Sequence, residues 1–156
     1  MKAKLSALLL VVTFLSGCYG INKMRFYPVK DTAAQAPSPA FIAKMKGGSY
    51  SGQISVVLPD GETCKGPWTR VSREPNAGGA SVAATAEGMP AVWDKVYGQG
   101  FYLAHVLGKY VHGTAVVTGD RGTVLNVEFV GAEETEPGRG VARDNNANVY
   151  KVVIDP

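Results

Sequence analysis

Pairs of short β-branched and apolar runs, each pair separated by a polar turn, constrain the fold of this chain more than any other feature. The three pairs are residues 53–58 with 62–71, residues 114–117 with 123–130, and residues 141–143 with 148–154. Their turns contain Asp60, Asp120 and Asp144 respectively. Turns of this composition between such runs are typical of β-hairpins. We therefore expect antiparallel hairpins that form a β-sandwich or a partly closed barrel.

Side chains within these runs alternate, which predicts the face that each strand buries. The inward sets are Ile54, Val56 and Leu58; Cys64, Gly66 and Trp68; Leu125, Val127 and Phe129; and Tyr150, Val152 and Ile154. Successive side chains of a strand point to opposite faces, so each set shares one face. These residues are the expected core.

Residues 90–97 break the β pattern and predict one short helix. Pro90 suits the first helical turn and Gly98 the end. Trp93, Val96 and Tyr97 fall on one side of this helix. Since helices of this length are marginal alone, we expect Trp93 to be buried against the sheet. The alternative is that Trp93 is exposed and binds a partner protein or a glycan ring.

The other segments carry weaker patterns. Residues 24–29 predict a short edge strand limited by Pro28, and residues 41–46 favour a strand over a helix. Residues 101–107 predict a further strand. Residues 70–88 and 132–139 are small, polar or acidic, and predict loops.

The first eighteen residues have the pattern of a secretory signal peptide. Lys2 and Lys4 precede an apolar run at residues 5–15. The run is shorter than a bilayer-spanning helix requires. Residues 15–18 are Leu-Ser-Gly-Cys. This ending resembles the lipobox of bacterial lipoproteins, which carry a type II signal peptide.

The lipobox resemblance implies a lipid anchor. It implies cleavage before Cys18, diacylation of its sulfur by fatty acids such as palmitate, and often acylation of the new amino terminus. Tyr19 follows instead of Asp, which in this family implies export to the outer membrane, facing the periplasm. The expected organisation is a signal peptide at residues 1–17, a lipidated Cys18 with tether and linker to residue 40, and one β-rich domain at residues 41–156. Residues 19–23 are the expected tether.

Composition excludes some partners. The chain has 16 Lys and Arg against 13 Asp and Glu, but Lys2 and Lys4 belong to the signal peptide. The mature chain is therefore nearly neutral. It has no basic cluster along the sequence of the kind that predicts nucleic-acid binding, so we expect no nucleic-acid partner.

Cys64 is the second of two cysteines. If Cys18 carries lipid, Cys64 has no partner within the chain, which excludes a disulfide framework. The inward position beside Trp68 predicts a buried and inert thiol. The alternative is a redox or metal-handling role, and no neighbouring His or Cys supports it.

No set of residues predicts catalysis, a metal or a cofactor. Asp94, His105 and His112 are the acid–base groups that an enzyme acting on envelope polymers could use, but no Gly-x-Ser-x-Gly motif accompanies them. The two histidines are poorly spaced for a shared metal. Asp144, Asn146 and Asn148 match the start of a calcium loop, but Val149 occupies the glycine position, which predicts a plain turn.

Two further resemblances carry little chemistry. Residues 140–150 resemble one hairpin of an NHL-type propeller blade, but propellers need several blades. Residues 51–68, 93–108 and 113–150 are similar to small uncharacterised bacterial lipoproteins, which implies a compartment and no activity. The sequence thus predicts a non-catalytic binding or assembly module in the cell envelope. Its expected partners are the membrane through Cys18 and an envelope protein or glycan.

Overall fold

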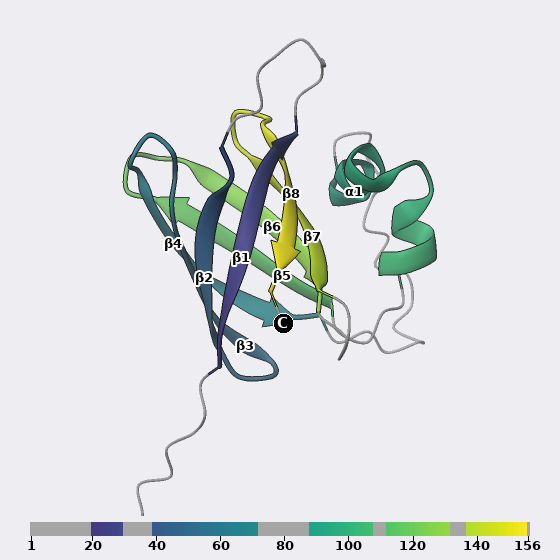
Figure 1. Ribbon diagram of the computed structural model, residues 1–156, viewed down its shortest axis with the longest axis horizontal. Helices are drawn as coiled ribbons and strands as arrows, with labels where there is room; N and C mark the ends of the chain where they lie inside the picture. The colour runs from purple at the N-terminus through teal and green to yellow at the C-terminus, as the bar shows by residue number, and fades with distance from the viewer. Residues whose placement is uncertain (1–19, 30–38, 72–87, 108–111, 132–136, 156) are drawn as a thin grey trace, which may run out of the picture.

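The computed structural model describes residues 20–29, 39–71, 88–107, 112–131 and 137–155. The elements are β1 (Gly20–Val29), β2 (Phe41–Gly47), β3 (Ser51–Val57), β4 (Thr63–Arg70), α1 (Met89–Tyr97), the π-helical segment η1 (Tyr102–Val106), β5 (His112–Gly119), β6 (Val124–Val130), β7 (Gly138–Asp144) and β8 (Val149–Ile154). In these described residues the eight strands form one closed barrel, and α1 and η1 lie outside it (Figure 1).

Each strand pairs antiparallel with the next, and β1 pairs with β8 to close the barrel. The closing register places Phe26 opposite Val152 and Met24 opposite Ile154. Closure leaves none of these strands with an open edge, which removes a template for aggregation. The expected mainly β fold is thereby confirmed, and the barrel is fully closed.

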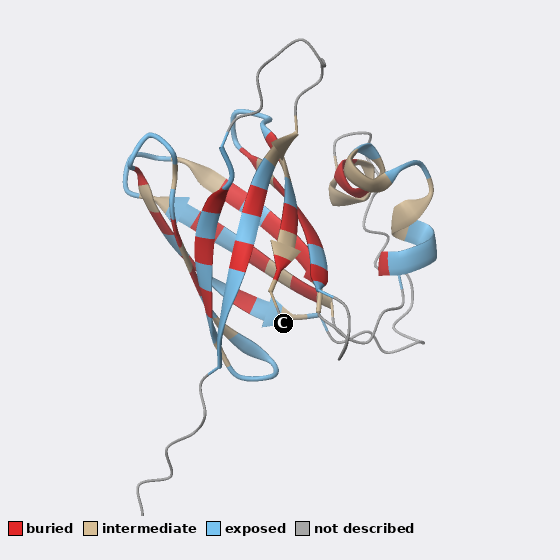
Figure 2. Ribbon diagram, viewed as in Figure 1, coloured by how far each residue is buried: buried red, intermediate tan, exposed pale blue. Residues whose placement is uncertain are grey.

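The barrel interior is filled by the inward side chains of all eight strands. Buried and exposed residues alternate along the strands as Figure 2 shows. Every inward set expected from the sequence faces this interior, with Leu58 and Tyr150 partly buried. Aromatic rings pack in two places: Phe41 stacks on Phe26 at 5.1 Å between centroids, and Trp68 meets Phe129 edge-on at 5.8 Å. Such contacts add about 0.5–1.5 kcal/mol each beyond area burial.

The short helix docks on the outside of the barrel, as expected. Trp93 is 0% exposed and belongs to a second apolar cluster with Val92, Val106, Val141 and Val149. The hydroxyl of Tyr97 donates a hydrogen bond to the carbonyl of Gly140 on β7, at 3.1 Å. The prediction that Trp93 is buried against the sheet is confirmed.

The strand predicted for residues 101–107 is wrong, because this segment forms η1 instead. The Asp94 carboxylate accepts hydrogen bonds from the backbone N–H groups of Gly100 and Tyr102, both at 3.0 Å, and this turns the chain back on α1. Phe101 then stacks on Trp93 at 5.9 Å and on Tyr97 at 4.7 Å. Packing on α1 therefore outweighs the local alternation.

The barrel also begins earlier than expected. Residues 20–23, predicted as tether, belong to β1, so residues 20–29 are part of the β domain that was expected to start at residue 41. The strand predicted for residues 24–29 is confirmed as part of β1, but its expected edge position is wrong, since β1 pairs with both β2 and β8. Pairing with β2 ends at Phe26, so Pro28 lies where β1 has a neighbour on one side only. That position tolerates the missing proline N–H.

Of the remaining predictions, one strand is confirmed, one loop boundary is wrong, and several segments lie outside the described residues. The strand favoured for residues 41–46 is confirmed as β2. Gly138 and Arg139, predicted as loop, begin β7. Some predicted segments lie outside the described residues: residues 72–87 and 132–136 of the predicted loops, residues 30–38 of the predicted linker, and Cys18 with the predicted signal peptide. In the described part of the chain, no helix has the length and apolar character needed to span a membrane.

Candidate functional site

The two ends of the barrel differ, and a buried carboxylate joins two turns at the end that carries the β3–β4 and β5–β6 turns. Glu62 precedes β4 at this end and is 3% exposed. Its carboxylate accepts hydrogen bonds from the backbone N–H of Arg121 at 2.9 Å and of Thr123 at 3.0 Å, and from the Thr123 hydroxyl at 2.6 Å. The hydroxyl of Thr123 is the main cause that lowers the Glu62 pKa. An ionised carboxylate thus ties the β3–β4 and β5–β6 turns together.

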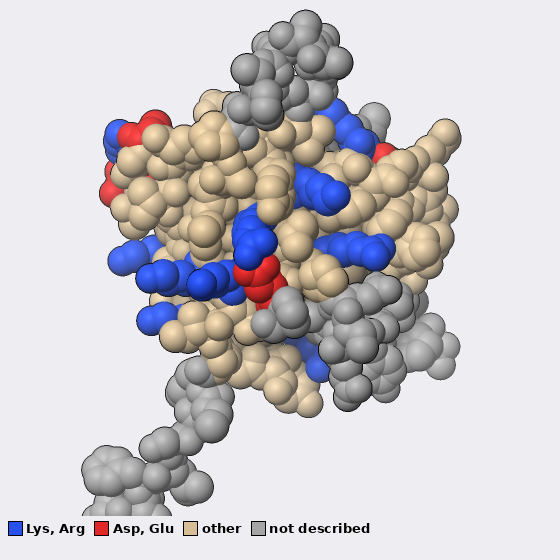
Figure 3. Space-filling model, in the orientation of Figure 1, with Lys and Arg blue, Asp and Glu red and all other residues tan. Residues whose placement is uncertain are grey.

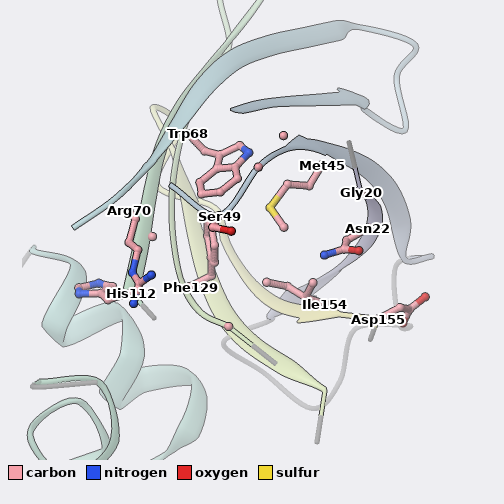
Figure 4. A pocket seen from close by; sticks show the side chains of 14 residues that line it. Gly20, Asn22, Met45, Ser49, Trp68, Arg70, His112, Phe129, Ile154 and Asp155 are labelled. Carbon is pink, nitrogen blue, oxygen red and sulfur yellow. The ribbon is translucent and has the colours of Figure 1, made fainter. Parts of the chain in front are cut away.

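The opposite end contains a cavity of about 280 Å³, shown in Figure 4. Its floor consists of the apolar side chains Met45, Trp68, Phe129 and Ile154. Small-molecule pockets commonly measure about 300–1,000 Å³ and combine an apolar lining with a few polar groups. This cavity is slightly smaller than that range and has that composition.

Glycines make room for the cavity. Gly47 and Gly113 both line it. A Cβ atom on Gly113 would collide with the ring of Phe129, and Gly47 has a φ of +149°, which other residues rarely adopt. The indole N–H of Trp68 donates to the carbonyl of Lys46 at 3.1 Å and so holds its ring in the floor. The hollow is therefore built into the barrel end.

Polar side chains line the rim of this cavity. Asn22, Ser49, Arg70, His112 and Asp155 take part. In Figure 4, Arg70 and His112 lie on one side of the cavity and Asn22 and Asp155 on the other. A cation on one side and an acid on the other make the rim able to orient an amphipathic molecule whose apolar part fills the floor.

His112 is joined to a buried carboxylate. Its Nε2 lies 2.6 Å from Oε1 of Glu128, which is 6% exposed on the outer face of β6. The indole N–H of Trp93 donates to Oε2 of the same carboxylate at 2.7 Å. Both carboxylate oxygens therefore have partners, as burial of such a group requires. Glu128 links the helix α1 to the cavity rim.

Sequence reasoning missed Glu128. Glu128 lies between the inward residues Val127 and Phe129. A glutamate at an outward position of an amphipathic strand is normally exposed to solvent, so the sequence did not single it out. The signal that could have found it was the expectation that Trp93 docks on the sheet, since a buried indole N–H needs an acceptor. A polar residue on the covered face was therefore required.

The three acid–base candidates do not form one site. His112 lies at the cavity rim, bonded to Glu128. The Asp94 carboxylate accepts hydrogen bonds from the backbone N–H groups of Tyr102 and Gly100, and these bonds lower its pKa. The His105 ring is exposed and packs on Phe101 at 4.5 Å between centroids. Asp94 and His105 thus belong to the α1–η1 segment, and only His112 reaches the cavity.

The Asp144 turn is explained without a cation. Its carboxylate accepts hydrogen bonds from the backbone N–H groups of Asn146 and Asn148, at 2.9 and 2.8 Å, and from the Asn148 amide at 2.8 Å. The hydroxyl of Tyr150 donates to it as well, at 3.2 Å. Among the described residues there is no group of three or more His, Cys, Asp or Glu that could hold a metal. The turn predicted at this position is confirmed.

Cys64 is free and fully buried inside the barrel. Burial is the main cause that raises its pKa to about 11, and the nearby Glu62 carboxylate adds to it. Because the thiolate is the reactive form, we expect the native protein to react slowly with a maleimide at pH 8. Roughly one thiol in a thousand is ionised there.

The control for this prediction is a Val116→Cys variant, whose new thiol replaces a side chain that is 53% exposed on β5. This thiol should react at once, and Cys64 should do so only after denaturation, as followed by intact-mass spectrometry. Native labelling of Cys64 as fast as that of the introduced cysteine would show that the thiol is accessible.

No family model, curated protein or solved structure matches this chain.

Proposed function

We propose that this chain is a membrane-anchored envelope lipoprotein whose barrel serves as a non-catalytic binding module. In this proposal Cys18 carries the lipid, the protein lies on the outer membrane facing the periplasm, and the cavity at one barrel end is the binding site. The ligand class is a small amphipathic molecule with an apolar ring or short chain and an anionic group.

The position of the cavity relative to the expected anchor supports this proposal most. Gly20 begins β1, lines the cavity and follows Cys18 by two residues. Two extended residues span about 7 Å. A lipidated Cys18 would therefore keep the cavity beside the membrane surface, where amphipathic molecules concentrate.

The ligand class follows from the cavity lining. Met45, Trp68 and Phe129 provide polarizable and aromatic surface, and Arg70 at the rim provides a cation for an anionic group. Arg70 also lies over the ring of Tyr50 at 5.6 Å, which orients its guanidinium. At about 280 Å³ the cavity suits one ring system or a short chain, and not an entire lipid.

The two alternatives have less support. The enzyme reading rests on the pair His112 and Glu128, but Glu128 is also bonded to Trp93 beneath α1, so its position is explained by the docking of the helix. The redox or metal reading rests on Cys64, which is buried and has a raised pKa. We therefore retain binding as the proposed function.

A binding titration with naphthalene-1-sulfonate, an aromatic sulfonate with one ring system, tests the cavity. We expect the Arg70→Gln variant to bind it about tenfold more weakly, since a hydrogen bond to a charged group contributes about 1.5 kcal/mol. The matched control is Arg121→Gln, the same change at the opposite end of the barrel, where Arg121 pairs with Asp60 at 2.7 Å. Unchanged affinity in both variants would place the probe elsewhere and overturn the cavity as the site.

A further inference from the structure

The charged residues on the outer face of β1 to β4 are all basic. Its outward positions carry Lys23 and Arg25 on β1, Lys44 and Lys46 on β2, and Lys65 on β4. None of the outward positions on these four described strands is acidic. Basic side chains accordingly predominate over β1 and β2 in Figure 3. Much of the positive charge of the described residues thus lies on one side of the barrel.

Three lysines lie at the centre of this face, which we call the lysine patch: Lys23, Lys44 and Lys46. The register places Lys23 directly opposite Lys44, and all three are exposed. Like charges at directly opposed positions destabilise a sheet. The described residues offer these lysines no acidic partner, because the nearby Asp155 carboxylate is bound by Arg25 at 2.8 Å. An anionic surface outside the protein would relieve this repulsion.

Apolar side chains alternate with the lysines. Ile21 is 60% exposed and lies opposite Lys46, and Ile42 is 55% exposed and lies opposite Arg25. Exposed isoleucines between lysines match a membrane interface, where the apolar groups enter the headgroup region and lysine side chains extend to the phosphates.

The geometry points to a membrane with anionic phospholipids as the occupant of this face. We propose that the lysine patch docks on anionic headgroups, which orients the barrel and its cavity at the bilayer surface. This inference rests on the proposed anchor at Cys18. Lys46 lies opposite Ile21. Ile21 follows Cys18 by three residues, which can span at most about 10 Å. One lipid anchor and a basic patch together give firmer attachment than either alone.

Lysine reactivity on vesicles tests this inference with the full mature lipoprotein. The protein is reconstituted in phosphatidylcholine vesicles and in vesicles that also contain phosphatidylglycerol, then treated with an amine acetylating reagent. Mass spectrometry measures acetylation at Lys23, Lys44 and Lys46. We expect acetylation of these lysines to be about fivefold slower on the anionic vesicles. The protection should disappear at about 1 M salt, where screening acts within about 3 Å.

Two controls isolate the patch. Lys95 on α1 is exposed and should react equally on both vesicles. In the double variant Lys44→Gln, Lys46→Gln, the remaining Lys23 should lose most of its protection, whereas Lys95→Gln, Lys151→Gln removes the same charge elsewhere and should leave it protected. Equal acetylation of the patch on both vesicle types would overturn the inference.

Flotation of the same samples separates this inference from the anchor. Flotation with both vesicle types supports the anchor, and lysine protection then decides the patch. Flotation with the anionic vesicles alone would support binding by the lysine patch and would contradict the proposed lipid anchor at Cys18. Flotation with neither would overturn both.

Discussion

Replacing Trp93 with alanine is expected to lower the free energy of unfolding by about 3–5 kcal/mol, the range observed for removal of a buried tryptophan. Trp93 is 0% exposed, stacks on Tyr97 at 5.4 Å and on Phe101 at 5.9 Å, and donates its N–H to Glu128 at 2.7 Å. The substitution therefore opens a cavity and leaves a buried carboxylate oxygen without its donor. Small domains are stable by about 5–15 kcal/mol, so the loss is a large share of the total.

Thermal and denaturant melts of two variants separate the packing from the hydrogen bond. Trp93→Phe keeps an aromatic ring against Tyr97 and Phe101 but removes the donor to Glu128. We expect it to lose about 1–3 kcal/mol, the cost of an unsatisfied buried acceptor. Tyr50→Ala removes an aromatic ring that is 70% exposed and should change stability little. A Trp93→Ala melt that matches the unchanged protein would contradict the structural role of this residue.

Replacing Cys18 with serine is expected to abolish lipid attachment completely. Acylation of a lipoprotein requires a thiol at this position, and a serine hydroxyl does not substitute for it in the reaction that the lipobox resemblance implies. Growth of cells with an alkyne-tagged fatty acid, followed by coupling to a fluorophore, measures the label. The protein should also change from the membrane fraction to unprocessed or soluble forms, because the proposed attachment depends on acyl chains.

The matched control uses the other cysteine of the chain. Cys64→Ala removes the thiol that is buried in the barrel and should leave labelling intact. Equal labelling of the Cys18→Ser variant and the unchanged protein would refute the anchor. Loss of labelling only in the Cys64→Ala variant would show that the fatty acid is attached at Cys64 instead.

The sequence determined most of the inward residues of the barrel. Alternation predicted that Ile54, Cys64, Trp68 and Leu125 face one side, and all four are buried in the interior. This prediction succeeded because side chains of a strand alternate between two faces. In a half-buried strand, apolar residues at every second position therefore identify the inner face. The turn at Asp144 could also be predicted from local sequence, because its carboxylate accepts hydrogen bonds from the N–H groups of neighbouring residues.

The cavity could not be predicted, because it depends on residues far apart in the chain. Met45, Trp68, Phe129 and Ile154 come from four different strands and meet only when the barrel closes. No local pattern distinguishes a residue in the middle of a core from one at its open end. Only the register of the strands decides which inward residues form the floor.

By itself, the sequence determined the antiparallel hairpins, the one docked helix with Trp93 buried, and the expectation of a lipid anchor at Cys18. Tertiary structure alone decided that β1 closes the barrel, that residues 102–106 form η1, and that Glu128 is buried between Trp93 and His112. The physical reason is common to all three. Each depends on contacts between different elements, which are adjacent in sequence for α1 and η1 and distant for the other two. These contacts outweigh the local preferences of the residues involved.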